Sequence, residues 1–332
     1  MWNLSNCEIQ GRGHVQKKVP CQDKTKATFK DGTYIIALSD GAGSAKLSHF
    51  GAECVVETIS DFFVDRFDPL YDEMDGRLVK VAIIENILAK IDSLASEMNC
   101  MPKDLAATML VVAVKDDRFI IAHIGDGVIG YLDGDTLKVA SAPCNGEHAN
   151  ETFFVTSRDA INTMNLFKGK VNNIAGFVLM SDGTEQSLYN KKNNTLSNAV
   201  VKLMQRNLLL EKSEMNAQLQ ITFENIVITR TQDDCSIALM SRENNILHPM
   251  YKLTFAEKCD LYDVNYKGKT AKKRVERYDE ILNLIKKPMT CEALSRKIHL
   301  EAKYTRRHLE HLHSIGLLKK TNNYYHQARS RL

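Results

Sequence analysis

The sequence Tyr-Ile-Ile-Ala-Leu-Ser-Asp-Gly occupies residues 34–41, where an apolar run typical of a buried strand ends in an aspartate followed at once by glycine. The same arrangement recurs at residues 119–127 and at residues 176–183. A fourth acidic element, Asp233-Asp234, directly precedes the apolar run of residues 235–240. Four strand ends of this kind can bring oxygen ligands to one edge of a β core.

Carboxylates that converge at one edge of a β core need a cation to coexist. The aspartates concerned are Asp40, Asp126, Asp182 and Asp233. Held a few ångströms apart they would repel one another, and a bound divalent ion removes that conflict. All-oxygen ligation favours Mg²⁺ or Mn²⁺, and no Cys-x-x-Cys or His-x-x-x-His spacing lies near these residues. A single Asp-Gly is more often an ordinary turn, but three copies in similar contexts favour a metal site.

The composition is that of a soluble globular protein. The chain has 332 residues, of which 44% are hydrophobic and 26% charged, enough for one large domain and a smaller one. No apolar run is long enough to cross a bilayer, and residues 1–6 lack the charged and apolar regions of a signal peptide, so we expect a cytoplasmic protein that does not bind membranes. The eight cysteines show no paired spacing, which indicates reduced thiols and not a disulfide framework.

Charge divides the chain into two parts. Residues 1–270 carry 29 basic against 35 acidic residues, whereas residues 271–332 carry 15 basic against 6 acidic ones. The C-terminal part is therefore a separate, strongly basic unit.

Hydrophobic periodicity predicts an α+β layered domain for the first 241 residues. We expect helices at 48–66, 78–98, 195–206 and 210–222, and strands ending at Asp40 and at 107–114, 118–124, 127–132, 136–140, 176–183, 225–230 and 235–241. Strands in runs and helices in runs favour this class over a doubly wound parallel sheet. The segment 141–175 shows only weak periodicity.

The remainder of the chain reads as a connection followed by a compact helical unit. Residues 242–274 look like a linker, with a basic stretch at Lys267–Arg274. Helices are predicted at 275–287, 290–298 and 301–315, followed by two short strands around Asn322-Asn323. Helix, helix-turn-helix and β wing is the order of a winged helix, which we place at residues 275–326.

Together with Gln22-Asp23, the three Asp-Gly elements and Asp233-Asp234 make residues 1–241 resemble the metal-dependent protein phosphatases of the protein phosphatase 2C family, in a bacterial form. The resemblance implies a two-sheet β sandwich flanked by helices. It also implies hydrolysis of phosphomonoesters on serine and threonine side chains of proteins by water that Mn²⁺ or Mg²⁺ activates, with no phosphoenzyme. The implied partners are a phosphorylated protein substrate and a cognate Ser/Thr kinase.

The resemblance assigns metal contacts residue by residue. Two cations, and a more loosely bound third, would be held by Asp23, Asp40, Gly41, Asp126, Asp182 and Asp233. Asp40 corresponds to the bridge between two ions, and Gly41 to a glycine that offers its carbonyl. The further ligands of the other ion correspond to Asp182 and Asp233. Asp23 would act through water, and Asp126 would contribute to the third ion.

The chain departs from the family pattern around the phosphate. Gln22 replaces the glutamate that often precedes the aspartate, which weakens one water-mediated contact. The phosphate-binding arginine of eukaryotic members falls on Lys18, and Arg12 and His14 are the alternatives; the sequence does not choose among them.

The chain also lacks the family's general-acid histidine, which is Ala42 here. Protonation of the leaving group then falls to metal-bound water, His14, His49 or solvent. Thr108 we interpret as a core packing position.

Residues 141–175 resemble the flap that borders the active site in this family. Asn145-Gly146-Glu147 and Asn150-Glu151-Thr152 lie in this segment. The alternative is an exposed loop with helix caps.

Two other functions compete with the phosphatase. One is a transcription regulator or phosphoprotein-binding pseudophosphatase whose domain senses without turnover, and the complete set Asp40, Asp182 and Asp233 argues against it. The other is a phosphatase or phosphotransferase with an aspartyl nucleophile, for which the Asp-x-Asp expected near the start of the chain is missing.

The basic C-terminal unit suggests binding of nucleic acid or of a protein. The exposed cations expected to make the contact are Lys303, Arg306, Arg307, Lys319 and Lys320, with His308 and His311 on the same helix. Charge alone does not separate DNA from a protein partner.

Overall fold

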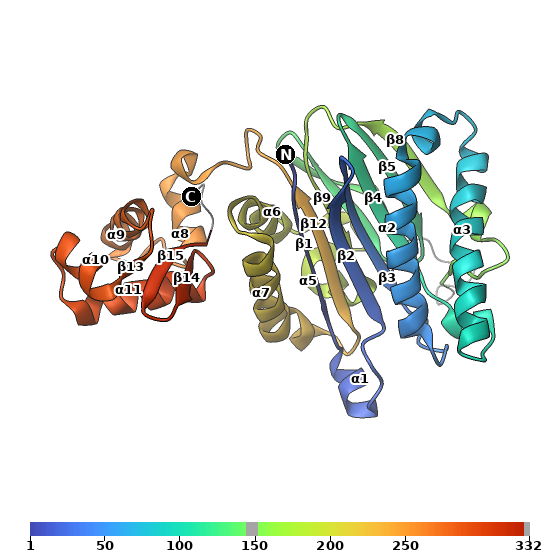
Figure 1. The fold of residues 1–332 in the computed structure, drawn as a ribbon, viewed down its shortest axis with the longest axis horizontal. Coiled ribbons are helices and arrows are strands. Elements are labelled where there is room, and N and C mark those ends of the chain that lie inside the picture. Colours follow the sequence, from blue (N-terminus) through green and yellow to red (C-terminus); the bar gives the residue numbers. More distant parts are fainter. Residues whose placement is uncertain (144–151, 329–332) are drawn as a thin grey trace.

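Two five-stranded antiparallel sheets form the centre of the molecule in the computed structural model, which describes residues 1–143 and 152–328 (Figure 1). The first sheet has the order β1 (Asn3–Ile9), β12 (Cys235–Ser241), β9 (Ile174–Met180), β6 (Val128–Asp133) and β7 (Thr136–Ser141). The second has the order β2 (Asp23–Lys30), β3 (Thr33–Asp40), β4 (Met109–Lys115), β5 (Arg118–Ile124) and β8 (Asn165–Lys170).

Alternation along each strand explains how both faces of the sheets are covered. In β3, Ile36 and Leu38 pack between the two sheets, whereas Ile35 and Ala37 pack against the helical layer. Because both sets are apolar, the strand reads as an unbroken hydrophobic run in the sequence. This burial on two sides confirms the predicted sandwich and fixes the register of its strands.

Helices cover the outer faces of both sheets. The long helices α2 (Ser48–Asp72) and α3 (Gly76–Glu97) pack on the second sheet, and α6 (Ala199–Leu209) and α7 (Lys212–Thr222) pack on the first (Figure 1). The predicted helix at 48–66 thus extends to residue 72.

Short elements complete this domain. They are α1 (Arg12–Lys17), η1 (Pro102–Leu105), α4 (Ala160–Thr163), η2 (Asp182–Thr184), α5 (Glu185–Leu188), β10 (Tyr189–Asn190), β11 (Thr195–Leu196), η3 (Phe223–Val227) and η4 (Ile228–Arg230).

The C-terminal unit has the predicted order of elements. It contains α9 (Ala271–Leu284), β13 (Met289–Thr290), α10 (Cys291–Lys297), α11 (Ala302–Ser314), β14 (Leu318–Thr321) and β15 (Tyr324–Gln327). Strands β14 and β15 pair as a hairpin, and β13 pairs with β15. Asn322 lies in the turn of the hairpin with φ 54°, a left-handed conformation that asparagine tolerates well.

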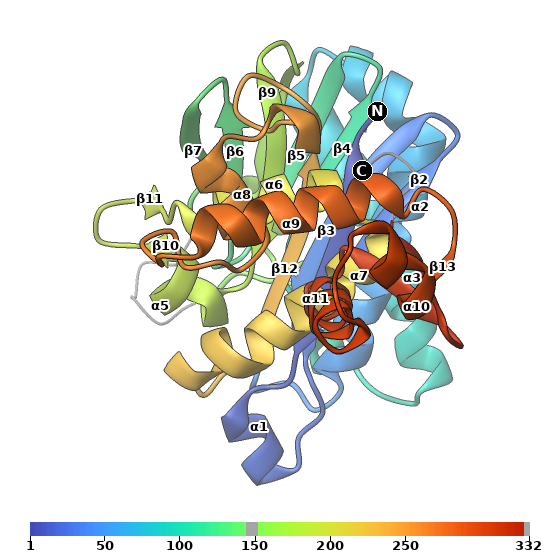
Figure 2. The same cartoon turned by 90° about the vertical axis from the view of Figure 1, so that its left-hand side faces the viewer.

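This unit packs against the first sheet's helical layer (Figures 1 and 2). Gln218 of α7 donates a hydrogen bond to the Ser314 carbonyl at 2.8 Å, and the Lys319 ammonium lies 3.3 Å from the Glu214 carboxylate of α7. Lys202 of α6 forms an ion pair with Asp260 at 2.7 Å. One apolar core continues from α6 and α7 into the C-terminal helices.

The strand predicted at residues 225–230 is wrong, because this segment is helical. Its β-branched residues resemble a strand, but the buried side chains are Phe223 and Val227, four positions apart, while Ile226 is 53% exposed. Burial at a spacing of four is the pattern of a helix face.

Residues 242–274 contain more structure than the expected connection. The short η5 (Met250–Lys252) and α8 (Phe255–Leu261) lie within this range. Thr254 and Glu257 form a capping box at the start of α8, a signal that was present in the sequence. Tyr262, which follows α8, is buried and donates its hydroxyl to Asp279 of α9 at 2.5 Å. Residues around α8 therefore share the core of the C-terminal helices.

The seven cysteines within the described ranges are all free. Across the same ranges, none of the helices is both long enough and apolar enough to cross a bilayer.

The buried His123 of β5 gives the first testable prediction. Its Nδ1 atom lies 2.7 Å from the Ser141 hydroxyl, and burial lowers its pKa to about 4. Because the ordinary pKa is about 6.5, the unfolded chain binds the extra proton first as pH falls. We expect the neutral His123 to contribute stability above about pH 6.5 that is lost by about pH 4, an effect of roughly 3 kcal/mol.

Urea titrations of wild type and His123→Gln at several pH values test this expectation. As pH falls from about 6.5 to about 4, the free energy of unfolding of the wild type should decrease by more than that of the variant. Parallel pH profiles for the two chains would contradict it.

Candidate active site

The predicted carboxylates meet at one edge of the sandwich. Asp40 ends β3, and Asp23 begins β2 directly opposite it in the strand register. Asp182 follows β9, Asp126 follows β5, and Asp233 precedes β12. These residues come from both sheets, and the negative charges of the other four all act on Asp40.

Burial and mutual repulsion disfavour the charged forms of three of these aspartates. Burial, and then the charges of Asp23 and Asp182, raises the pKa of Asp40 well above its usual range. Burial, and then the charge of Asp234, has the same effect on the pKa of Asp23. Burial, followed by the charges of Asp126 and Asp233, raises the pKa of Asp182 to about 7. The site therefore favours anything that brings positive charge to it.

Unpaired carboxylate oxygens indicate what is missing from this arrangement. Both carboxylate oxygens of Asp23 and the Oδ1 atom of Asp182 are buried and accept no hydrogen bond of normal geometry, although the Ser181 and Ser236 hydroxyls act on Asp23 in the direction that lowers its pKa. Buried acceptors of this kind are costly unless a donor or a cation satisfies them. A hard divalent cation fits a donor set made only of oxygen atoms.

The carboxylates do not form a ready-made coordination cage. Within residues 1–143 and 152–328, no three His, Cys, Asp or Glu side chains are close enough together to hold a metal directly. Mg²⁺ usually keeps several of its water molecules, so water can join the carboxylates to such an ion.

Two glycines allow the close backbone contacts of the site. A Cβ atom on Gly41 would lie 2.8 Å from the backbone of Ser48, and one on Gly183 would lie 1.9 Å from the carbonyl oxygen of Asp234. The Gly41 N–H donates to the Gln22 carbonyl at 3.1 Å. Both Asp-Gly pairs therefore need glycine for close approach.

Thr108 does more than pack in the core, which corrects its interpretation from the sequence. Its hydroxyl accepts a hydrogen bond from the Asp40 N–H at 2.8 Å, and its own N–H donates to the Asp40 carbonyl at 2.8 Å. These two bonds fix the backbone that carries the Asp40 carboxylate. Its place immediately before β4, the strand beside β3, was the signal available in the sequence.

The two predicted phosphate-binding cations differ in their surroundings. The Arg12 guanidinium donates hydrogen bonds to the carbonyls of Thr229 and Thr231, at 3.1 Å and 2.9 Å. Lys18 caps α1 in a left-handed conformation with φ 58°, and its ammonium is exposed and makes no polar contact with any residue in the described ranges.

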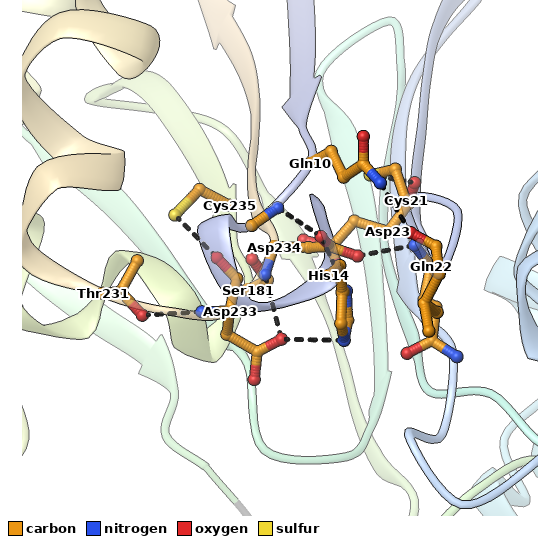
Figure 3. A network of polar contacts seen from close by, with 12 residues as sticks. Gln10, His14, Cys21, Gln22, Asp23, Ser181, Thr231, Asp233, Asp234 and Cys235 are labelled. Atoms are coloured by element: carbon orange, nitrogen blue, oxygen red, sulfur yellow. Dashed lines mark hydrogen bonds and ion pairs between the residues drawn. The ribbon is translucent and has the colours of Figure 1, made fainter. Parts of the chain in front are cut away.

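The other departures from the expected pattern are also located. The Gln22 side chain donates to the Ser48 hydroxyl of α2 at 2.7 Å. Ala42 is buried, and the His49 ring lies 4.2 Å from the Phe50 ring. His14 lies beside both carboxylates of the Asp233-Asp234 pair (Figure 3).

The two neighbouring aspartates Asp233 and Asp234 have different environments. The Asp233 side chain is 55% exposed, whereas that of Asp234 is 2% exposed. Both oxygens of Asp234 accept backbone hydrogen bonds, from Gly11 and from Gln22. The sequence predicts a metal contact for Asp233 and assigns no role to Asp234, so this structural carboxylate is a finding of the structure.

Among the described residues, the segment predicted as a flap contacts one of the site's aspartates through Thr152. The Thr152 hydroxyl donates to Asp126 Oδ2 at 2.6 Å. Asn145-Gly146-Glu147 and Asn150-Glu151 lie outside the described residues.

The predicted cations of the C-terminal unit differ in their surroundings. Lys303, Arg306 and Arg307 are exposed on α11, with Arg307 stacked over Tyr304. Lys320 of β14 lies over the Tyr325 ring, whereas Lys319 is paired with Glu214.

The two histidines expected beside these cations point into the unit. His308 and His311 both contact the buried Tyr278 ring, and His311 Nε2 lies 2.6 Å from the Tyr262 carbonyl. Both histidines therefore contribute to the packing of the unit.

Comparisons with known proteins agree with this geometry. The family model described as Protein phosphatase 2C matches residues 10–224. The serine/threonine-protein phosphatase 3 of Escherichia coli (strain K12) is 27% identical over 205 residues, which cover 58% of this chain and 78% of that protein.

Solved structures resemble the fold. A serine/threonine phosphatase of S. agalactiae has a TM-score of 0.53 at 19% identity and covers 73% of this chain and 100% of its own. A bacterial serine phosphatase has a TM-score of 0.53 at 13% identity, with coverages of 74% and 99%.

Cation binding at this site should depend on pH. With a pKa of about 7 in the metal-free chain, Asp182 holds a proton that a cation must displace. We expect the apparent affinity for Mn²⁺ to be at least about tenfold higher at about pH 8 than at about pH 6, because the raised pKa values of Asp23 and Asp40 act in the same direction. Calorimetric titration of Mn²⁺ at both pH values measures this ratio, and Asp182→Asn should reduce it. Equal affinity at the two pH values would contradict the assignment.

Proposed function

The chain belongs to the protein phosphatase 2C family, and we propose that it hydrolyses phosphoserine and phosphothreonine esters of proteins with bound Mn²⁺ or Mg²⁺. The observation that carries the proposal is the set of aspartates at one sheet edge. Their charges act together on Asp40, and the buried oxygens of Asp23 and Asp182 lack a hydrogen-bond partner of normal geometry. A phosphate ester brings further negative charge to this edge, so its binding also requires cations.

Six residues would hold the cations. They are Asp23, Asp40, Gly41 through its carbonyl, Asp126, Asp182 and Asp233. Bound divalent cations supply Lewis-acid activation of the water that attacks phosphorus and neutralise charge on the phosphoryl oxygens. The chain's contribution is to hold these oxygen ligands in position at the ends of rigid strands.

Lys18 is more available than Arg12 to bind the phosphate. Its ammonium is exposed and has no partner among the residues of the described ranges, whereas Arg12 would first have to leave the carbonyls of Thr229 and Thr231. Lysine neutralises a phosphate as a point charge and can adapt to substrates of different shape. A Ser/Thr kinase that produces the phosphorylated substrate is the expected functional partner.

We also propose that the C-terminal unit is a winged helix that binds DNA or a protein. Lys303, Arg306 and Arg307 on α11 and Lys320 on β14 are exposed, and the Arg306 guanidinium lies 4.0 Å from the Glu292 carboxylate of α10. Lys319 is engaged with Glu214 and Ser213 of the phosphatase domain, so it would have to be released first.

The phosphatase proposal predicts the effect of Asp40→Asn. Because Asp40 would bridge two cations, its loss should lower kcat/KM for a phosphothreonine peptide roughly 1,000-fold. Wild-type activity should require Mn²⁺ or Mg²⁺ and stop on addition of a chelator. The matched control is Asp135→Asn, an exposed aspartate in the β6–β7 turn, which should retain full activity. Activity that survives both chelation and Asp40→Asn would refute the proposal.

The C-terminal proposal predicts the salt dependence of DNA binding by the full chain. If α11 contacts DNA phosphates, the double variant Arg306→Ala/Arg307→Ala should bind duplex DNA more weakly at about 150 mM salt, and the slope of log K against log salt should fall by about 2. The control Arg66→Ala/Lys90→Ala removes two exposed cations from α2 and α3. Equal binding by the two double variants would exclude α11 as the DNA contact and favour a protein partner.

A further inference from the structure

We propose that Asp234 is a positioning residue that holds together the three segments carrying the residues that would bind the cations and the phosphate. It would thereby set the affinity for the cations and for the phosphate without contacting them. The inference rests on the proposed function for its effect on catalysis. Its structural part stands on contacts of the chain alone.

Asp234 uses both of its carboxylate oxygens on backbone donors from distant parts of the chain (Figure 3). The Gly11 N–H donates to Oδ1 at 2.5 Å, and the Gln22 N–H donates to Oδ2 at 2.5 Å. The side chain is 2% exposed, and His14 Nδ1 lies 2.9 Å from Oδ1. Charge-assisted bonds of this kind, shielded from water, are among the stronger contacts a carboxylate makes.

The first donor ties α1 to the site. Gly11 is the residue immediately before α1, the helix that carries Arg12 and ends at Lys18. The Gly13 N–H also donates to the Gln232 carbonyl at 2.8 Å, two residues before Asp234. Asp234 therefore fixes where both candidate phosphate-binding cations lie relative to β12.

The second donor ties the other ligand segments together. Gln22 precedes Asp23, and its carbonyl accepts the Gly41 N–H at 3.1 Å. One peptide segment thus links Asp234 to Asp23 and, through Gly41, to Asp40. Asp233 is attached directly, and its Oδ1 accepts the Asp234 N–H at 2.9 Å. The exposed Asp233 carboxylate stays available for a cation, while Asp234 holds the backbone at Gly11 and Gln22 in place.

Chemistry explains why an aspartate is needed at position 234. A carboxylate accepts at two oxygens, whereas an asparagine amide accepts at one and presents an NH₂ group to the other donor. Asp234→Asn keeps the size of the side chain but leaves one of the two buried N–H groups without an acceptor. Groups that orient metal ligands typically change metal affinity 10- to 100-fold when they are altered.

The test compares Asp234→Asn with Asp233→Asn in the full chain. Calorimetry with Mn²⁺ should show roughly 10- to 100-fold weaker binding for Asp234→Asn. At saturating Mn²⁺ this variant should recover kcat to within a few-fold of wild type while KM for the phosphopeptide stays raised. Asp233→Asn should not recover, because it lacks a proposed ligand.

Amide hydrogen exchange of the metal-free proteins supplies a readout that does not depend on activity. Exchange at Gly11, at Gln22 or at both should be faster in Asp234→Asn and unchanged in Asp233→Asn. If Asp234→Asn does not fold, Asp234→Ser repeats the comparison with one acceptor kept.

Three results would overturn the inference. They are wild-type Mn²⁺ affinity in Asp234→Asn, unchanged exchange at both amides, and a loss of kcat that saturating Mn²⁺ does not restore, which would make Asp234 a direct ligand. A wild-type chain that binds no Mn²⁺ would instead refute the proposed function, and the exchange comparison would still decide whether Asp234 holds the loops.

Discussion

Carboxylates forced together at one edge of two packed sheets are the constraint on which the rest of the molecule depends. The strand pairing places Asp23 opposite Asp40, and the packing of the second sheet on the first brings Asp182 to the same edge. Because both faces of these strands are buried, the backbone has little freedom to relieve the repulsion. Close-contact glycines and the Thr108 hydroxyl hold the arrangement further. The fold thus holds these carboxylates in mutual repulsion, which a bound cation would relieve.

The sequence predicted this edge well because its signals are local. An apolar run followed by Asp-Gly specifies a buried strand and a sharp turn, and repetition of the pattern distinguishes a site from a turn. The sandwich and the order of the C-terminal elements follow from similar local periodicity. The strand at 225–230 failed because β-branched residues such as Ile226 favour a strand, whereas only a tertiary contact shows which side of the segment is buried.

The structural role of Asp234 was beyond the sequence. Two adjacent aspartates before a strand look equivalent, and what separates them is contact with Gly11 and Gln22, more than 200 positions earlier in the chain. In the same way, no local pattern shows that Arg12 is held by the carbonyls of Thr229 and Thr231. Site geometry made by long-range backbone contacts can be read only from the folded chain.

The ion pair between Lys319 and Glu214 couples the two parts of the molecule energetically. Lys319 belongs to the hairpin of the C-terminal unit, and Glu214 to the helix α7 whose continuation leads to Asp233. A partner that takes the Lys319 ammonium must replace this contact, so its affinity for the hairpin is reduced by whatever free energy the docked arrangement provides. By thermodynamic linkage, a ligand that stabilises the arrangement in which the hairpin contacts α7 also lowers the affinity of that partner, and by the same factor.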